Sequence, residues 1–336
     1  MRPQDLLVPR PEGLYCPPGD FFIDPVRPVP RALVTHAHSD HARPGHGAVL
    51  ATRETLDIMA LRLGPDFAAA RQAAAYGEIL DLGGVRVAFH PAGHVLGSAQ
   101  IEVAAPGLRI VAAGDYKRGP DPTCAGFVPV ACDVFITEAT FALPVFRHPA
   151  PGAEIARLLA SLAQFPERTH VVGVYALGKA QRLIALIRAA GYDAPIFLHG
   201  ALRRICDYYA SRGVALGPLA DATIDRRERE RFAGAVVLAP PSVFGAAWIR
   251  RFEDPLAAFA SGWMQVRARA RQRGVELPLV ISDHCDWDEL TATLTELSPA
   301  ETWVTHGREE ALVRWCVLNG LAARPLHLVG YEEEPD

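Results

Sequence analysis

The sequence predicts an α/β protein, and three observations carry this prediction. Residues 1 to about 145 alternate short apolar runs with turns that contain Gly and Pro, a pattern typical of strands. After residue 150, helix-length segments alternate with short apolar runs, which indicates βαβ units around a parallel sheet. Proline density rises over residues 144–151, which favours a boundary between the two parts.

In the first part we expect strands at apolar runs and helices at two longer segments. The predicted strands are residues 32–35, 85–89, 100–103, 109–113 and 134–137. The predicted helices are residues 55–63 and the Ala-rich run 67–75.

The second part is predicted to alternate regularly. Its helices are expected at residues 153–164, 179–190 and 202–212, and its strands at 171–175, 195–198 and 235–239. After Gly274 follow a strand at 279–281, a helix at 287–297, a strand at 302–304 and a helix at 309–317. Because metal-ligand residue types reappear late in the chain, we interpret the middle block as an insertion. The expected domains are residues 1–145, 146–277 and 278–336.

Composition limits the function classes. The formal net charge of −4 argues against a globally basic nucleic-acid-binding protein, although a local basic groove stays open. The six cysteines form no C-x-x-C pair, so a disulfide framework is not expected and reduced thiols fit better. There is no signal-peptide layout and no apolar run near the roughly 20 residues that span a membrane. We therefore expect a soluble cytoplasmic protein without a membrane partner.

The most informative segment is His36-Ala37-His38-Ser39-Asp40-His41, which follows the apolar run 32–35. Three of the twelve histidines of the chain lie in this hexapeptide. In an extended segment His36 and His38 project to the same side, and Asp40 and His41 follow a turn. Imidazole nitrogens with carboxylate oxygens suit zinc, and manganese or iron less well.

Three further metal-type residues each follow an apolar stretch. Asp24 follows residues 21–23, His94 lies among small residues after Phe89, and Asp115 ends the run 110–114. Two histidines recur after the middle block, in Ser282-Asp283-His284 and in Trp303-Val304-Thr305-His306. Glu138 lies in Thr137-Glu138-Ala139-Thr140.

Arginine and lysine also mark candidate contacts to an anion. Gly178-Lys179 opens a predicted helix, where free N–H groups and the helix dipole favour a phosphate. Arg203, Arg250 and Arg267 begin short arginine-rich stretches that are candidates for backbone contact. The alternating charges of residues 225–231 instead predict an exposed helix with internal salt bridges.

The H-x-H-x-D-H segment, with Asp24, His94 and Asp115 in this order, resembles the metallo-β-lactamase superfamily. Glu138, the helix start at Gly178, the Ser282-x-His284 motif and His306 resemble its β-CASP nuclease branch, with Gly262-Trp263-Met264-Gln265 similar to the bacterial DNA-ligase-associated exonucleases. The resemblance covers nearly the whole chain. It implies a metallo-β-lactamase αββα sandwich with an inserted β-CASP α/β domain.

The resemblance also implies roles. One metal would be held by His36, His38, His94 and Asp115, and a second by Asp40, His41, the bridging Asp115 and His306. Both ions would be divalent, zinc first and manganese as the alternative. His284 would protonate the leaving oxygen and Glu138 would orient its ring, while Asp24 would orient a metal ligand. Gly178, Lys179 and Ser282 would contact phosphate.

The leading hypothesis is a metal-dependent nuclease that hydrolyses DNA, an exonuclease of DNA repair that works with a DNA ligase and a helicase. An RNA-processing β-CASP enzyme is the first alternative, because RNA-type members carry His where His306 lies and Artemis-like DNA nucleases carry Val. A small-molecule ester or thioester hydrolase shares the H-x-H-x-D-H motif but would not need Glu138 or His284. A binding module without catalysis is the last alternative, and the intact ligand set argues against it.

Overall fold

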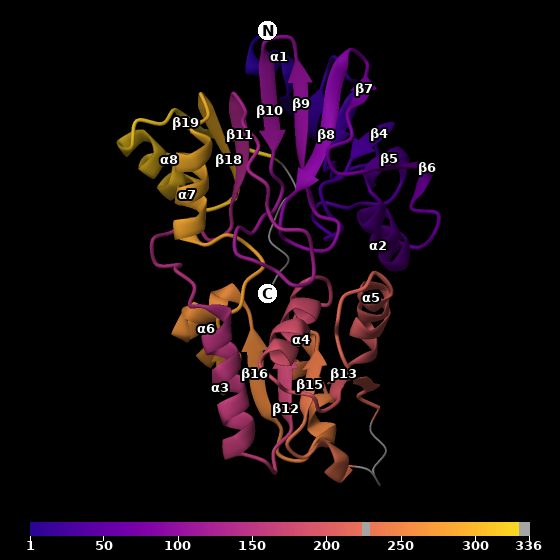
Figure 1. Cartoon of the computed structure of the whole chain (residues 1–336), viewed down its shortest axis with the longest axis vertical. Helices are drawn as coiled ribbons and strands as arrows, with labels where there is room; N and C mark the ends of the chain where they lie inside the picture. The colour runs from indigo at the N-terminus through magenta and orange to yellow at the C-terminus, as the bar shows by residue number, and fades with distance from the viewer. Residues whose placement is uncertain (224–228, 329–336) are drawn as a thin grey trace. The chain divides into compact units, whose positions relative to one another are not determined.

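The computed structural model describes residues 1–223 and 229–328 (Figure 1). It has mixed α/β architecture, as predicted, with three sheets among the described residues. The chain divides into two compact units, Met1–Arg147 with His284–Asp336, and His148–Asp283. The breaks at 147/148 and 283/284 compare with 145/146 and 277/278 expected from the sequence.

The first sheet of the first unit has the strand order β1-β2-β3-β4-β5-β6. Strands β1 to β3 pair antiparallel, whereas β3 to β6 pair parallel. Helix α2 (Arg53–Leu63) contacts β5 and β6, and α1 (Pro3–Leu6) precedes the sheet. The strands are β1 (Val8–Arg10), β2 (Gly13–Cys16), β3 (Phe21–Ile23), β4 (Arg31–Leu33), β5 (His46–Thr52) and β6 (Ala68–Ala74).

The second sheet of this unit has the order β19-β18-β11-β10-β9-β8-β7, so strands that precede and follow the middle block of the sequence lie side by side. Helices α7 (Trp287–Leu297) and α8 (Glu309–Leu318) belong to the same unit. The strands are β7 (Leu80–Leu82), β8 (Val85–Pro91), β9 (Ala99–Ala105), β10 (Leu108–Ala112), β11 (Val134–Ala139), β18 (Glu301–Gly307) and β19 (Ala323–Pro325).

Both faces of the second sheet are buried. One apolar cluster joins side chains of the first sheet, such as Phe21, to side chains of the second, such as Ile101 and Ile136. A separate cluster joins Phe135 of β11 to Leu290 of α7 and to residues of α8. All six residues of β11 are buried, which explains why Val134, Phe135 and Ile136 are consecutive apolar residues rather than an alternating pattern.

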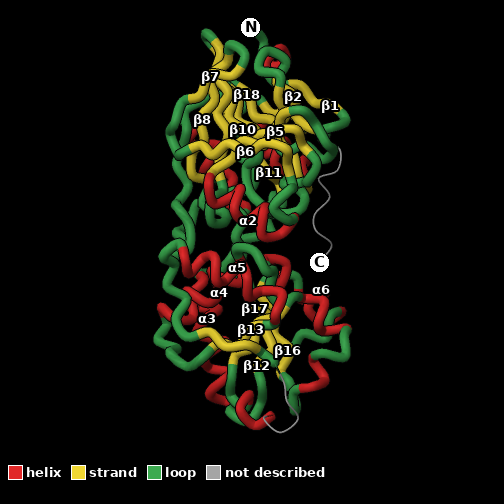
Figure 2. Tube along the Cα trace, turned by 90° about the vertical axis from the view of Figure 1, so that its right-hand side faces the viewer, coloured by secondary structure: helices red, strands yellow, loops and turns green. Residues whose placement is uncertain are grey.

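The second unit contains a parallel sheet with the order β14-β13-β15-β12-β16-β17, which confirms the predicted βαβ character. Helices make up a larger part of this unit than of the first (Figure 2). Its main elements are α3 (Pro151–Gln164), β12 (His170–Gly173), α4 (Lys179–Ala189), β13 (Ile196–Leu198), α5 (Gly200–Ser211), β14 (Leu219–Asp221), β15 (Val236–Ala239), β16 (Leu256–Ala260), α6 (Arg267–Gln272) and β17 (Leu277–Leu279). Four 3-10 helices are also present: η1 (Arg229–Phe232), η2 (Pro241–Gly245), η3 (Ile249–Arg251) and η4 (Gly262–Gln265).

One predicted element is wrong. The Ala-rich run 67–75 is not a helix but strand β6, which pairs parallel with β5 from His46↔Ala68 to Thr52↔Ala74. The helix preference of alanine is at most about 1 kcal/mol per residue over other residue types, and the hydrogen bonds to β5 outweigh it. The other predicted strands and helices are present, with ends shifted by a few residues.

Residues 225–228 of the alternating charge run lie outside the described residues, so the predicted salt-bridged helix is not tested there. Within the described ranges, no helix is at once long and apolar enough to cross a lipid bilayer.

Candidate metal centre

The predicted metal-type residues of the first unit all follow, or end, a strand. Asp24 follows β3, the His36–His41 segment follows β4, His94 follows β8 and Asp115 follows β10. Parallel neighbouring strands end at the same edge of a sheet, so the segments that leave them come close together. The remaining residues are Glu138 and His306, at the ends of β11 and β18.

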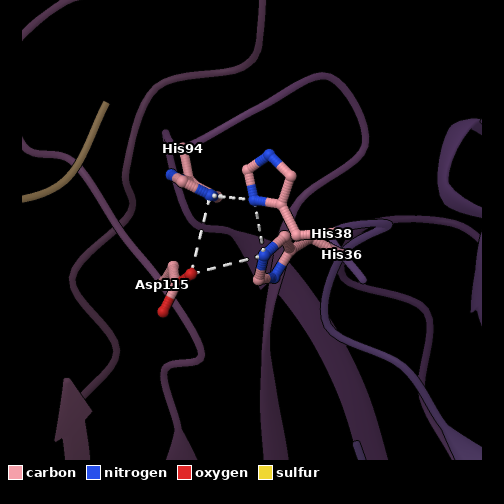
Figure 3. A group of neighbouring side chains, drawn as sticks. All are labelled: His36, His38, His94 and Asp115. Atoms are coloured by element: carbon pink, nitrogen blue, oxygen red, sulfur yellow. Dashed lines mark hydrogen bonds and ion pairs between the residues drawn. The ribbon is translucent and has the colours of Figure 1, made fainter. Parts of the chain in front are cut away.

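The first four predicted ligands converge on one point (Figure 3). The ligand atoms of His36, His38, His94 and Asp115 lie within 4.8 Å of one another. His38 Nδ1 is 3.1 Å from His36 Nε2 and 3.0 Å from His94 Nε2. Asp115 Oδ2 is 3.4 Å from His36 Nε2 and 3.7 Å from His94 Nε2. Three imidazoles and one carboxylate therefore form a donor set of the kind that holds zinc.

The residues predicted for a second ion lie next to this group. His36, Asp40 and His41 also bring ligand atoms within 4.8 Å of one another. His41 Nε2 is 3.7 Å from Asp40 Oδ2 and 3.5 Å from Asp115 Oδ2. The ring of His306 stacks on that of His41, with centroids 4.9 Å apart. Asp115 thus faces both groups.

Asp24 contacts His41 at the ring nitrogen that does not face Asp115. Its Oδ2 lies 2.7 Å from His41 Nδ1 and accepts a hydrogen bond from Thr35 Oγ1 at 2.6 Å. Its Oδ1 accepts from the backbone N–H of Thr35 at 2.7 Å. Because Nδ1 of His41 is engaged, Nε2 is the atom left facing Asp115, which is the geometry of a residue that orients a ligand.

Glu138, which is buried, and His284, which is partly exposed, form a separate pair. His284 Nδ1 lies 3.0 Å from Glu138 Oε2, and the two residues form a close group with Asp115. The register between β11 and β18 shifts between Thr137 and Ala139, so that two residues of β18, Thr305 and His306, lie opposite Glu138. Opposite it, His306 adopts a left-handed φ of 57°. Bulges re-aim side chains, and backbone strain of this kind gathers at functional sites.

The electrostatics of the centre follow from burial and proximity. Burial, followed by the charge of His41, holds the pKa of His36 well below its ordinary value and lowers that of His306 to about 4. His41 is the exception: burial opposes its charged form, but Asp115, Asp40 and Asp24 raise its pKa well above the ordinary value. Burial also opposes ionisation of Asp115, yet His41 and His284 hold its pKa well below the usual range. Burial raises the pKa of Glu138.

The geometry does not support the predicted phosphate site at Gly178 and Lys179. The N–H of Gly178 donates to Gln181 Oε1 at 2.8 Å, and the N–H groups of Lys179 and Ala180 donate to backbone carbonyls. Lys179 is buried beside Asp283, with 3.1 Å between Nζ and Oδ1. The charge and these N–H groups are therefore engaged within the protein. Ser282 is buried as well.

The arginines divide into two sets. Arg203 is held by Asp207 at 2.9 Å and by Asp221 at 3.2 Å. Arg267 and Arg271 are exposed on α6 and form no ion pair within the described part of the chain. They lie one helical turn apart, so they share a face. Arg250 is also exposed and forms no ion pair with any described residue, so Arg250, Arg267 and Arg271 each keep a charge that is available to a phosphate backbone.

Sequence analysis missed several residues that support the centre. Arg62 of α2 donates to the carbonyl of Ala37, between the first two histidines. Thr35 contacts Asp24 and also lies 3.1 Å from His36 Nδ1 through its hydroxyl. For Arg62 no sequence signal exists, because one arginine among many on a helix is ordinary. Thr35 directly precedes His36, and a hydroxyl at that place is a usable signal.

The loop of His94 is fixed by Gly97. The carbonyl of Gly97 accepts hydrogen bonds from the hydroxyls of Thr52 at 2.6 Å and Thr55 at 3.0 Å, at the start of α2. Gly97 has a left-handed φ of 83°, and an added Cβ would lie 2.6 Å from Glu54 Cβ and 2.7 Å from Thr55 N.

Replacement of Gly97 with alanine is expected to lower the free energy of unfolding by about 2–4 kcal/mol, from the clash and the strained φ together. Gly107→Ala is the matched control, since Gly107 has a similar φ of 74° but no atom within 4 Å of an added Cβ. It should cost only the backbone strain of about 1 kcal/mol. Denaturant unfolding of both variants measures the difference, and equal losses would contradict the close approach at Gly97.

The sequence of the chain is similar to those of several known proteins. No protein-family model matches the chain. A probable DNA ligase of Opitutus terrae is 28% identical over 327 residues, which is 91% of this chain and 30% of the relative. Endoribonuclease ysh-1 of Neurospora crassa is 32% identical over 188 residues, 53% of this chain and 22% of the relative. Endoribonuclease YSH1 of Saccharomyces cerevisiae is 31% identical over 145 residues, 39% and 18% respectively. The chain therefore spans less than a third of the length of these curated relatives.

A solved structure shares the fold. A protein of unknown function from Enterococcus faecalis matches with a TM-score of 0.60 and 12% identity, over 90% of this chain and 80% of that chain. The bacterial relative aligns with nearly all of this chain, so the similarity extends over both units. Together with the YSH1 endoribonucleases, this relative supports the predicted relationship of the chain to the β-CASP branch of the metallo-β-lactamase superfamily.

Proposed function

We propose that this chain is a metal-dependent nuclease that hydrolyses phosphodiester bonds of DNA, as an exonuclease of DNA repair. The observation that carries the proposal is the contact between the buried Glu138 and the partly exposed His284, which lies beside Asp115 and the histidine cluster. A hydrolase of small thioesters needs the metal ligands but not an additional acid and a carboxylate that orients it, because a thiolate leaves without a proton. A phosphodiester leaves an alkoxide, which does need a proton.

We also infer that the architecture is the αββα sandwich with a β-CASP insertion. The two sheets that share one apolar cluster, with α2 on one sheet and α7 and α8 on the other, would be the four layers. The unit His148–Asp283 would be the inserted domain.

The residues fit two divalent ions. The donors are imidazole and carboxylate. His38 Nδ1 lies 3.1 Å from the Nε2 atom of His36 and 3.0 Å from that of His94. Oδ1 of Asp40 is buried without a hydrogen-bond partner among the described residues, which suits a carboxylate that takes a cation. His36, His38, His94 and Asp115 would hold one ion, and Asp40, His41, Asp115 and His306 the other. Zinc suits this donor set best, with manganese as the alternative.

Bound divalent ions would activate water and neutralise charge on the phosphate. The chain itself would do the rest. His284, protonated, would donate to the leaving oxygen, and Glu138 would fix the ring through Nδ1 so that Nε2 carries the transferred proton. Asp24 would keep His41 in register. Arg267 and Arg271 would contact the polynucleotide backbone, because their charges are exposed and form no ion pair with any described residue.

RNA is the second candidate substrate. The YSH1 relatives are named endoribonucleases. The resemblance to the β-CASP nucleases also implies a His, as at His306, in RNA-processing members. The bacterial relative that covers most of this chain is named a probable DNA ligase, which favours DNA and a ligase of the same pathway as partner. A helicase would complete such a pathway.

The test is a cleavage assay on 5′- and 3′-labelled DNA and RNA, single- and double-stranded, with zinc or manganese, alongside elemental analysis. We expect two ions per chain, release of mononucleotides from DNA, and loss of activity on chelation. Preferential cleavage of RNA would move the answer to the second candidate. An enzyme that hydrolyses thioesters and no polynucleotide would overturn the proposal.

A further inference from the structure

The chain has only two lysines among its 34 basic residues, and both are buried ion-pair partners. Lys117 is 7% exposed and pairs with Glu289, while Lys179 is 6% exposed and pairs with Asp283. The two carboxylates flank His284 in the sequence: Asp283 directly precedes it, and Glu289 lies in the first turn of α7. Burying an ion pair stabilises a fold weakly, if at all, so this placement calls for another reason.

The Lys117 pair joins two segments of the first unit. The carboxylate of Glu289 receives three donors: Nζ of Lys117, the N–H of Gly119 at 2.7 Å and the N–H of Asp286 at 3.2 Å. The first two donors belong to the segment after Asp115, and the third begins α7. One carboxylate therefore ties the segment that follows the bridging aspartate to the segment that follows His284.

The peptide groups of Tyr116 form a second tie between the same segments. The N–H of Tyr116 donates to Glu138 Oε1 at 2.8 Å, and its carbonyl accepts from the N–H of Cys285, also at 2.8 Å. Glu138 Oε2 is the atom that contacts His284 Nδ1. Lys117, the next residue, thus fixes a segment that contacts both the carboxylate that orients the ring and the residue after the ring.

The Lys179 pair fixes the residue before His284, within the second unit. Asp283 is 2% exposed, and its Oδ1 lies 3.1 Å from Nζ of Lys179, the first residue of α4. The same Nζ lies 4.6 Å from the centroid of the Tyr175 ring. A cation held between a carboxylate and an aromatic ring is fixed in place, so Asp283 is anchored to the start of a helix.

We propose that Lys117 and Lys179 are positioning residues for His284. Each fixes the chain on one side of the imidazole, so that the ring stays aligned with Glu138 and with the oxygen that it protonates. Displacement of a catalytic group by about 1 Å can cost about 10²-fold in rate, which is why such fixation matters. The inference rests on the proposed function, because it needs His284 to protonate a leaving group.

The experiment compares two substrates that differ in their need for an acid. The alkoxide leaving group of a DNA strand needs a proton, whereas the 4-nitrophenolate of bis(4-nitrophenyl) phosphate leaves without one. Lys117→Met and Lys179→Met are expected to lower kcat on DNA by about 10–100-fold, with KM and nitrophenyl ester hydrolysis nearly unchanged. Each lysine variant combined with His284→Ala should be no slower on DNA than His284→Ala alone, since the residue being positioned is gone.

Two further variants test whether the losses of activity come from impaired folding. Glu289→Gln keeps the shape of the side chain. It should also lower kcat on DNA more than nitrophenyl ester hydrolysis, but by a smaller factor than the lysine variants. Arg324→Met is the matched control, because Arg324 pairs with Glu301 at 2.8 Å in the first unit, at the start of β18 and away from His306 at its end. It should affect thermal stability and leave the ratio of the two activities unchanged.

Equal losses on both substrates, or losses that multiply with that of His284→Ala, would overturn the positioning role. For the Lys179 variant, a raised KM with a flatter salt dependence of binding would instead indicate that Lys179 contacts phosphate. If the wild-type protein cleaves neither substrate, the proposed function fails. The positioning role is then decided by nitrogen-edited NMR of the histidine rings, in which Lys117→Met should speed solvent exchange of the His284 Nδ1 proton, and an unchanged signal would refute it.

Discussion

Asp115→Ala is expected to cost roughly 10³- to 10⁵-fold in phosphodiesterase activity, because several kcal/mol of charge stabilisation would be lost with the ions. Asp115 Oδ2 lies within 3.7 Å of ring nitrogens of His36, His41 and His94, so this carboxylate faces both groups of ligands. The variant should therefore lose metal at both sites. Elemental analysis of the purified variant and cleavage of labelled DNA measure the two effects.

Glu102→Gln is the matched control for Asp115→Ala. Glu102 is also a largely buried carboxylate of the same sheet, and it contacts His90 at 2.9 Å and Arg109 at 3.0 Å. Its loss should alter stability and leave metal content at the wild-type level. If Asp115→Ala kept both ions, the bridging role of Asp115 would be wrong.

His284→Ala is expected to lower turnover on DNA by about 10²–10⁴-fold while metal content stays intact. The reason is that a general acid contributes only where the leaving oxygen needs a proton. Hydrolysis of bis(4-nitrophenyl) phosphate should therefore fall much less. Glu138→Gln should follow the same pattern more mildly, since Glu138 orients the ring through Nδ1 and does not itself transfer the proton.

His90→Ala is the control for His284→Ala, because His90 forms a comparable contact of 2.9 Å with Glu102 outside the centre. It should leave both activities unchanged. Loss of metal in His284→Ala, in step with its loss of activity, would identify His284 as a ligand and refute its role as the acid.

The candidate centre was accessible from the sequence because its residue types are rare and dense. Histidine and aspartate within one hexapeptide have few structural uses, and the lone Asp24, His94 and Asp115 each follow an apolar run that ends a strand. A strand end fixes the position of the residue after it, so the sequence order alone predicted that these side chains meet. The structure gathers them within a few ångströms.

Other features depend on long-range pairing and could not be predicted. The Ala-rich run 67–75 has a local preference for helix, and it forms a strand because it pairs with β5. The register shift that places Thr305 and His306 opposite Glu138 exists because β11 pairs with β18, more than a hundred residues away in the sequence.

The sequence by itself therefore determined the α/β class and the candidate ligand set, since periodicity and residue chemistry are local properties. Only the tertiary structure decided what the two lysines do. A lysine near a motif is as consistent with a phosphate contact as with an ion pair, and the choice depends on which carboxylate the fold brings to it. Here the fold buries Lys117 against Glu289 and Lys179 against Asp283, because leaving either charge in the interior without a partner would cost several kcal/mol.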